Sequence, residues 1–275
     1  MVKKKKSKLV FFVLILVVAT ILLLVTDPEL NLTGLLNLEK TPVPEPIPEG
    51  NLVFVSRVID GDTIELAGGD KVRLLGINTP ESNEVYYSEA KERAIDLMEK
   101  KTCELIFGDE KTDKYGRLLA FVECDKLNVN LQIVREGFAT VYLSAQDDLF
   151  FNELNSEQEF AERNEKGLWE KSEWIGSECV ELIELNEFDE YVKFKNSCEE
   201  EIDLIGISVK DAGRNKYVFE EFVLGSNEEL ILHTEIGVNS GNEFYWNSNS
   251  NIWNNDFDSL FVRDSKGKLV LFYEY

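Results

Sequence analysis

The pattern of apolar and polar positions divides the chain into a membrane-directed start, a spacer and two folded regions. A run of 17 residues that is apolar apart from Thr20 extends from Leu9 to Val25, directly after five lysines. This length lies at the short end of what a membrane-spanning helix needs. Residues 1–26 are therefore predicted to form a membrane segment. Residues 27–50, with alternating prolines at 42–48, predict an extended linker.

The membrane segment has two possible fates. No small-residue cleavage motif ends the apolar run and no cysteine follows it for lipid attachment, which favours a retained transmembrane helix over a removed signal peptide. With the lysines on the cytoplasmic side, the rest of the chain faces outward. We expect a single-pass protein of the cell membrane with its domains outside the cytoplasm. The alternative is secretion after signal cleavage.

Residues 51–174 alternate short β-branched stretches with helical patterns. Turn sequences Asp60-Gly61-Asp62 and Gly68-Gly69-Asp70 separate the first three stretches. The predicted strands are 52–59, 63–67, 71–77, 103–107 and 117–124. Three helices are predicted, one beginning at about Ser88, one at 129–136 and one at 149–166. Ser88 is a possible N-cap of the first helix. Five strands with three helices predict an OB-fold barrel of the α+β class.

Residues 178–275 lack helical periodicity and predict an all-β domain. Turn signals such as 186–189 and 264–267 separate the apolar stretches. The predicted strands are 180–185, 190–195, 202–210, 216–224, 229–233, 258–263 and 268–273. Short strands at this spacing favour an immunoglobulin-like β-sandwich.

Composition limits the chemistry. The 275 residues contain 29 Lys plus Arg and 52 Asp plus Glu, a formal net charge of -23, which excludes a general electrostatic DNA binder and leaves only local contact with nucleic acid. The single histidine excludes His-pair and His-ligated zinc mechanisms. Any hydrolysis here must use carboxylates, arginines and an oxygen-bound metal.

Two oxygen-rich strand ends supply such groups. Asp60 and Asp62 flank one glycine after the first strand, and Asn78-Thr79-Pro80-Glu81 follows the third. Together they form a plausible Ca²⁺ site, although Asp-Gly-Asp taken alone is more often only a turn. Arg73 and Arg117 stand close to these segments in the predicted barrel. Arginines beside a metal and a glutamate suit phosphodiester hydrolysis, because they stabilise charge on the phosphate.

These residues resemble one known family in three segments. Residues 59–63 (Ile-Asp-Gly-Asp-Thr), 73–81 (Arg-Leu-Leu-Gly-Ile-Asn-Thr-Pro-Glu) and 112–117 (Thr-Asp-Lys-Tyr-Gly-Arg) resemble the signature segments of the thermonuclease, or staphylococcal nuclease-like, family in family order. The similarity continues to 167–169 and covers about residues 51–170. It implies a calcium-dependent endonuclease acting on DNA and RNA.

The resemblance also implies a role for each matching residue. Asp62 and the Thr79 carbonyl would bind calcium, with Asn78 at a position where aspartate is more usual, which predicts weaker metal affinity. Glu81 would position or deprotonate the attacking water. The phosphate would be held by Arg73 and Arg117, and the substrate would be contacted by Lys114, Tyr115 and Tyr142. The acidic segment 82–87 predicts weak substrate capture.

The C-terminal region resembles the lamin tail domain, mainly through Tyr245-Trp246 and residues 253–258. That resemblance implies a non-catalytic attachment module whose partner, an envelope component or a protein, stays unknown. Trp246 and Trp253 are expected in the core rather than on a binding platform, and His233 is expected to be structural. A non-catalytic surface adhesion protein with a degenerate barrel is the alternative for the whole chain.

The four cysteines fall at matching positions of two predicted hairpins. Cys103 and Cys124 are centred on the Asp113-Lys114 turn, and Cys179 and Cys198 on the Phe188-Asp189 turn. Each pair could therefore face across its own hairpin and form a disulfide, which suits an outward-facing protein. Four buried thiols are the alternative.

Overall fold

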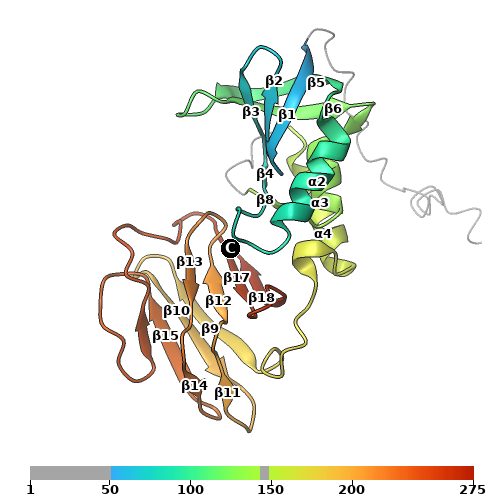
Figure 1. Cartoon of the computed structure of the whole chain (residues 1–275). Helices are drawn as coiled ribbons and strands as arrows, with labels where there is room; N and C mark the ends of the chain where they lie inside the picture. The colour runs from blue at the N-terminus through green and yellow to red at the C-terminus, as the bar shows by residue number, and fades with distance from the viewer. Residues whose placement is uncertain (1–50, 143–148) are drawn as a thin grey trace, which may run out of the picture. The chain divides into compact units, whose positions relative to one another are not determined.

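The computed structural model describes residues 51–142 and 149–275. The predicted membrane segment and linker lie outside the described residues. Within the described part, no helix is long and apolar enough to cross a membrane. The chain from Glu49 onward forms one compact unit, which contains both predicted folded regions (Figure 1).

Five strands form the barrel that the sequence predicts. They are β1 (Leu52–Asp60), β2 (Thr63–Leu66), β3 (Lys71–Leu74), β5 (Thr102–Thr112) and β6 (Leu118–Cys124). The strand order is β3-β2-β1-β5-β6, and a parallel pairing of β3 with β6 closes the sheet into a barrel. The short strand β7 (Leu127–Asn128) also pairs with β6. Val55, Ile64 and Val72 are fully buried on these strands, and Phe121 of β6 is buried against Phe150 at the start of α4.

The third predicted strand, 71–77, is wrong as a single element. The chain turns at Leu75 and Gly76, where Gly76 has a φ of 75°, and β4 (Ile77–Asn78) pairs instead with β8 (Thr140–Val141). The buried Asn130 side chain holds this turn, because it donates to the Leu75 carbonyl and accepts from the Val122 amide. The break moves Asn78 out of the barrel wall.

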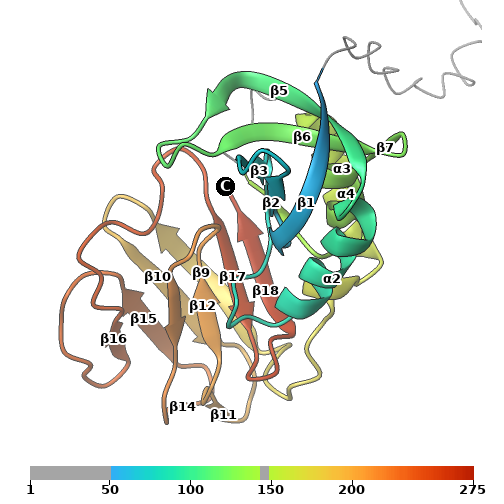
Figure 2. The same ribbon diagram turned by 45° about the horizontal axis from the view of Figure 1, so that its top comes forward.

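Three helices pack together on one side of the barrel in Figures 1 and 2. They are α2 (Tyr87–Met98), α3 (Val129–Arg135) and α4 (Phe151–Arg163), followed by the short 3-10 helix η3 (Gly167–Trp169). The prediction that Ser88 caps the first helix is wrong. Ser88 lies inside α2, and the chain enters through Tyr86 in a left-handed conformation with a φ of 68°. The apolar face of α2, including Ala90 and Ala94, is buried.

The C-terminal region is a β-rich domain that fits the immunoglobulin-like prediction. One sheet has the order β16-β15-β10-β9 and the other β13-β12-β17-β18, with β11 and β14 as a separate pair. The strands are β9 (Val180–Asn186), β10 (Tyr191–Asn196), β11 (Ile202–Asp203), β12 (Ser208–Lys210), β13 (Lys216–Val218), β14 (Val223–Leu224), β15 (Glu229–His233), β16 (Glu243–Tyr245), β17 (Ser259–Arg263) and β18 (Leu269–Glu274).

Two predicted strands of this domain are each split in two. Residues 202–210 contain a turn at Gly206, with a φ of 77°, between β11 and β12, and residues 216–224 divide into β13 and β14. The sequence analysis also missed β16, which pairs with β15 in parallel. In the two split strands the chain passes between the separate β11–β14 pair and the β13-β12-β17-β18 sheet, which the alternation of apolar residues does not reveal.

The two tryptophans Trp246 and Trp253 pack in the core of this domain, as expected. Trp253 is only 2% exposed, and Trp246 packs against it with ring centroids 6.1 Å apart. His233 stacks on Tyr245 at 5.0 Å, which agrees with a structural role.

An apolar contact joins the sandwich to the barrel domain. Trp169, after α4, is 1% exposed and packs edge-on against Phe272, with Phe261 and Leu269 in the same cluster. Backbone hydrogen bonds continue the contact, since Ser172 donates to the Leu269 carbonyl at 2.9 Å. In Figure 2, β17 and β18 are the strands of the sandwich that lie beside the barrel. This contact fixes which strands of the sandwich meet the barrel.

Both predicted disulfides are present. Cys103 pairs with Cys124 across β5 and β6, with Cα atoms 4.4 Å apart, and Cys179 pairs with Cys198 at 5.2 Å. The described residues contain no free cysteine.

We predict that replacing Cys103 and Cys124 together by serine lowers the free energy of unfolding by about 2–4 kcal/mol, because the cross-link restricts the unfolded chain. Urea denaturation of the oxidised protein measures this. The loss should match that of wild-type protein whose Cys103–Cys124 bond alone has been reduced. Alkylation of unreduced wild-type protein that modified all four thiols would contradict the assignment.

Candidate active site

The two oxygen-rich segments predicted from the sequence meet in the structure. Gly61 lies in the tight turn between β1 and β2, and a Cβ added there would come within 2.8 Å of the Thr79 hydroxyl. The turn therefore packs directly against the chain after β4. Asp62 is 8% exposed, and its Oδ2 accepts hydrogen bonds from the Thr79 amide and the Thr79 hydroxyl, both at 2.9 Å.

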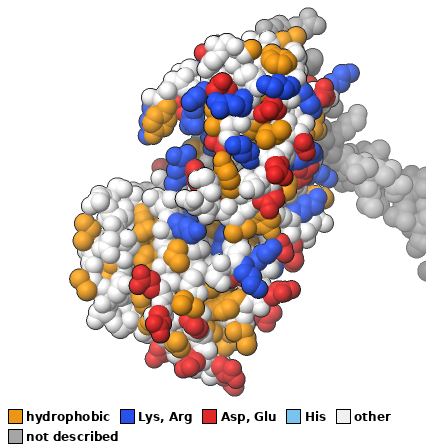
Figure 3. Space-filling model, in the orientation of Figure 1, with side chains coloured by type: hydrophobic (Ala, Val, Ile, Leu, Met, Phe, Trp, Pro, Cys, Tyr) orange, Lys and Arg blue, Asp and Glu red, His pale blue; other side chains and the backbone are white. Residues whose placement is uncertain are grey.

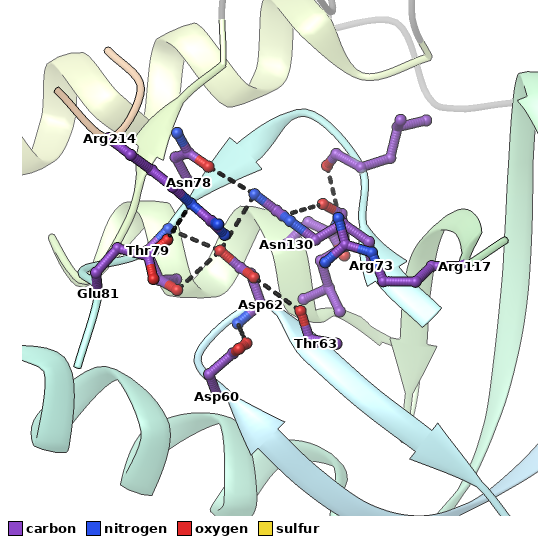
Figure 4. A network of polar contacts seen from close by, with 12 residues as sticks. Asp60, Asp62, Thr63, Arg73, Asn78, Thr79, Glu81, Arg117, Asn130 and Arg214 are labelled. Carbon is purple, nitrogen blue, oxygen red and sulfur yellow. Dashed lines mark hydrogen bonds and ion pairs between the residues drawn. The ribbon is translucent and has the colours of Figure 1, made fainter. Parts of the chain in front are cut away.

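Arg73 joins the two candidate metal ligands. From β3, its Nη2 donates to Asn78 Oδ1 at 2.6 Å and lies 3.2 Å from Asp62 Oδ2. Its Nη1 donates to the Leu74 carbonyl at 2.7 Å. In Figure 4 the guanidinium points between the Asp62 carboxylate and the Asn78 amide. A cationic group thus occupies the point on which these oxygens converge.

The oxygen atoms at this point are of the kinds that bind a calcium ion. A carboxylate, an amide oxygen and the adjacent Thr79 backbone are the hard oxygen ligands that calcium takes. Burial, followed by repulsion from Asp62, raises the pKa of the neighbouring Asp60. Among the described residues, no three His, Cys, Asp or Glu side chains cluster as a metal site. A cation here would therefore rely on amide and carbonyl oxygens as much as on carboxylates.

Arg117 lies in the turn between β5 and β6. Its Nε donates to Asp113 Oδ2 at 2.7 Å, and its guanidinium lies 5.7 Å from the centre of the Tyr115 ring. Burial opposes ionisation of Asp113, but the hydrogen bonds from Arg117 outweigh it and lower the pKa of that carboxyl. The parallel pairing of β3 with β6 places Arg73 opposite Leu119. Arg117 lies two residues before Leu119, next to the start of the strand segment that pairs with Arg73.

The predicted substrate-contacting residues are at the surface. Tyr115 is 73% exposed, and the Lys114 amine lies 5.2 Å from its ring. Tyr142 is 43% exposed, and its amide donates to the Gly76 carbonyl at 2.9 Å, which places it at the turn before β4. All three are available to a ligand from solvent.

Glu81 has a partner from the C-terminal domain. Its Oε1 lies 2.6 Å from the Nε of Arg214, in the turn between β12 and β13. The same turn accepts a hydrogen bond at its Ala212 carbonyl from the Asn78 amide group, at 2.8 Å. The sequence analysis missed both contacts, and the segments are too far apart in the chain for a local motif to signal them. Figure 4 shows Arg214 over Asn78 and Glu81.

The β12–β13 turn is held by its own hydrogen bonds. Asp211 accepts from the backbone amide and the side chain of Asn215 at 2.9 and 2.6 Å, and the Ala212 amide donates to Asp258 at 3.1 Å. Burial raises the pKa of Asp211 to about 6. The turn is thus held in place by the sandwich, and it contacts the candidate site.

Comparison with known families gives two matches. The family described as Staphylococcal nuclease homologue matches residues 71–171, and the Lamin Tail Domain matches residues 144–275. These are the two families that the sequence resembles, in the same order along the chain.

Three relatives illustrate the first match. The chain is 32% identical over 135 residues to Endonuclease YncB of Bacillus subtilis, covering 45% of this chain and 64% of that protein. It is 32% identical over 144 residues to an uncharacterized endonuclease of Haemophilus influenzae, covering 49% and 78%. It is 29% identical over 131 residues to the thermonuclease of Staphylococcus intermedius, covering 44% and 78%. The matches thus span less than half of this chain and less than two thirds of the Bacillus protein.

We predict that Asn78→Asp binds calcium about tenfold more tightly, because the added carboxylate supplies negative charge where the site has little. Isothermal titration calorimetry with calcium measures this. The control is Asn152→Asp, the same charge change on the exposed face of α4. Equal affinities for both variants would contradict the placement of the metal at Asn78.

Proposed function

Because the chain belongs to the staphylococcal nuclease family, we propose that it is a calcium-dependent endonuclease that hydrolyses phosphodiester bonds of DNA, RNA or both. The convergence of Asp62, Arg73 and Asn78, with Glu81 two residues beyond Thr79, is the observation that carries the proposal. Carboxylate, amide and guanidinium groups at one point suit a phosphate and its counter-ion.

Each residue has a chemical task in this proposal. Glu81 is half-exposed and orients or deprotonates the water that attacks phosphorus. Arg73 and Arg117 bind the phosphate oxygens and stabilise the negative charge that grows on them. Bound calcium would supply a further positive charge beside the phosphate. Asp62, Asn78 and the Thr79 carbonyl would hold that ion.

Arg73 must change partners during this reaction. In the structure its guanidinium is hydrogen-bonded to Asn78 and paired with Asp62, the groups assigned to the metal. To bind the phosphate, Arg73 would have to leave Asp62 and Asn78. A calcium ion held by those two residues would supply the positive charge that Asp62 then lacks. The arrangement is therefore the resting form of the proposed site.

The location and the C-terminal module belong to the same proposal. We propose that residues 9–25 anchor the chain in the cell membrane and that both domains face outward. Two disulfides support an oxidising environment. The sandwich is proposed to attach the enzyme to an envelope or protein partner. The alternative, a surface protein in which the barrel only binds, predicts no cleavage.

The main test is cleavage of DNA and RNA by the full chain in calcium or in excess chelator. We predict that Arg73→Ala and Glu81→Ala each lower kcat at least about a hundredfold, because each removes a group that acts on the transition state. Calcium-dependent loss of full-length substrate on a gel measures this.

The matched controls are Arg57→Ala, on β1 and paired with Glu65 at the surface, and Glu89→Ala, exposed in the first turn of α2. Both should retain wild-type activity. Folded, calcium-bound wild-type protein that cleaves neither nucleic acid would reject the enzyme and favour the binding alternative.

For the anchor, we predict that the full chain stays with membranes after alkaline carbonate extraction. A variant with Leu16→Arg and Val17→Arg should be released, because charges in the apolar run oppose insertion. Immunoblotting of the two fractions measures this. A full chain that appears in the medium at the mass of residues 27–275 would instead indicate signal cleavage.

A further inference from the structure

A cavity of about 380 Å³ lies between the barrel domain and the sandwich. One wall consists of Asn78, Thr79 and Pro80, which belong to the candidate active site. The opposite wall comes from the sandwich and includes Lys210, Lys216 and Arg263. The volume is within the range of pockets that bind nucleotide-sized ligands. The cavity therefore adjoins the proposed cleavage site.

The cations in this wall are unusual for their domain. Residues 176–275 contain 8 Lys plus Arg and 21 Asp plus Glu, yet three of the eight cations line this one cavity and Arg214 stands beside it against Glu81. On the face shown in Figure 3, basic side chains lie over the barrel and its junction with the sandwich, mixed with acidic ones, while the far end of the sandwich is mainly acidic. The cations of the sandwich thus lie mainly toward the barrel on this face.

Lys216 and Arg263 differ from Lys210 in their partners. Within the described residues, neither Lys216 nor Arg263 takes part in an ion pair, whereas Lys210 lies 3.5 Å from Glu84. Arg263 Nη1 instead donates to the backbone carbonyls of Leu168 at 2.6 Å and Gly267 at 3.2 Å. Burial lowers the pKa of Arg263 to about 10, still well above neutrality, so the side chain stays charged. Because its hydrogen bonds among the described residues go to neutral backbone carbonyls, this buried cation can still bind an anion.

The two acids of the cavity, Glu84 and Asp264, raise the pKa of Arg263 through their charge, and both also accept hydrogen bonds from other groups. Asp264 accepts hydrogen bonds from the amides of Lys266 and Lys268 and from the Ser172 hydroxyl. Glu84 is engaged by the Glu81 amide and by Lys210. Both carboxylates already have donors, and Lys216 and Arg263 remain available.

We propose that this cavity is a phosphate subsite for the nucleic-acid strand next to the bond that is cut, and that Lys216 and Arg263 bind its backbone. The sandwich would then contribute directly to substrate binding, in addition to attachment. The strand would pass from the barrel site, by Arg214, into the cavity. This inference rests on the proposed nuclease function, since it concerns the same substrate.

The test measures binding and needs no cleavage, so it is separate from the test of catalysis. A fluorescent single-stranded oligothymidylate is titrated with the full chain in excess chelator, and the dissociation constant is followed by anisotropy at several salt concentrations. We expect Lys216→Glu and Arg263→Gln each to weaken binding about five- to tenfold. The slope of log Kd against log salt should fall by about one for each residue, because each neutralises one phosphate.

The matched control is Lys193→Glu, the same charge reversal on β10 in the opposite sheet of the sandwich. It should change binding less than twofold. Lys216 is exposed, so its variant tests the proposal even where Arg263→Gln fails to fold. Equal binding by Lys216→Glu and Lys193→Glu would overturn the subsite. Tighter binding by Lys216→Glu would overturn it too, and would indicate that the sandwich obstructs the nuclease site.

Discussion

The Asp62 carboxylate ties together three parts of the barrel domain that are separate in the chain. It accepts hydrogen bonds from Thr79 and pairs with Arg73, while its own turn packs against Thr79 through Gly61. A carboxylate with 8% exposure needs such partners, because an unpaired buried charge is costly. The positions of Arg73 and Thr79 follow from this arrangement, whereas Arg117 is held by Asp113 and Glu81 is paired with Arg214.

In the proposed enzyme, Asp62, Arg73 and Asn78 would serve both the stability of the fold and the reaction. Without a bound cation, Arg73 supplies the positive charge that Asp62 requires. In the proposed function, Asp62 and Asn78 would hold a metal ion and Arg73 would bind the phosphate, so Arg73 would exchange one set of partners for another. Asn78 suits such an exchange, because its neutral amide binds a metal less strongly than a second carboxylate would.

The sandwich reaches this site because a separate contact holds it against the barrel. Trp169 and the aromatic residues of β17 and β18 form an apolar contact, away from the catalytic groups, that sets which face of the sandwich meets the barrel. The β12–β13 turn then reaches Asn78 and Glu81. Both domains are acidic overall. The few cations at this junction are therefore the main candidates for contacts with a phosphate.

The sequence by itself determined much of this protein. The turn chemistry of Asp60-Gly61-Asp62, the strand alternation and the hairpin positions of the cysteines predicted the barrel, the sandwich and both disulfides, because these depend on local spacing. Only the tertiary structure decided the break at Gly76, which requires Asn130 from a later helix, and the contacts of Arg214 and Ala212 with Glu81 and Asn78. Those contacts join residues more than 130 positions apart, and they arise from the packing of two domains, which no local pattern encodes.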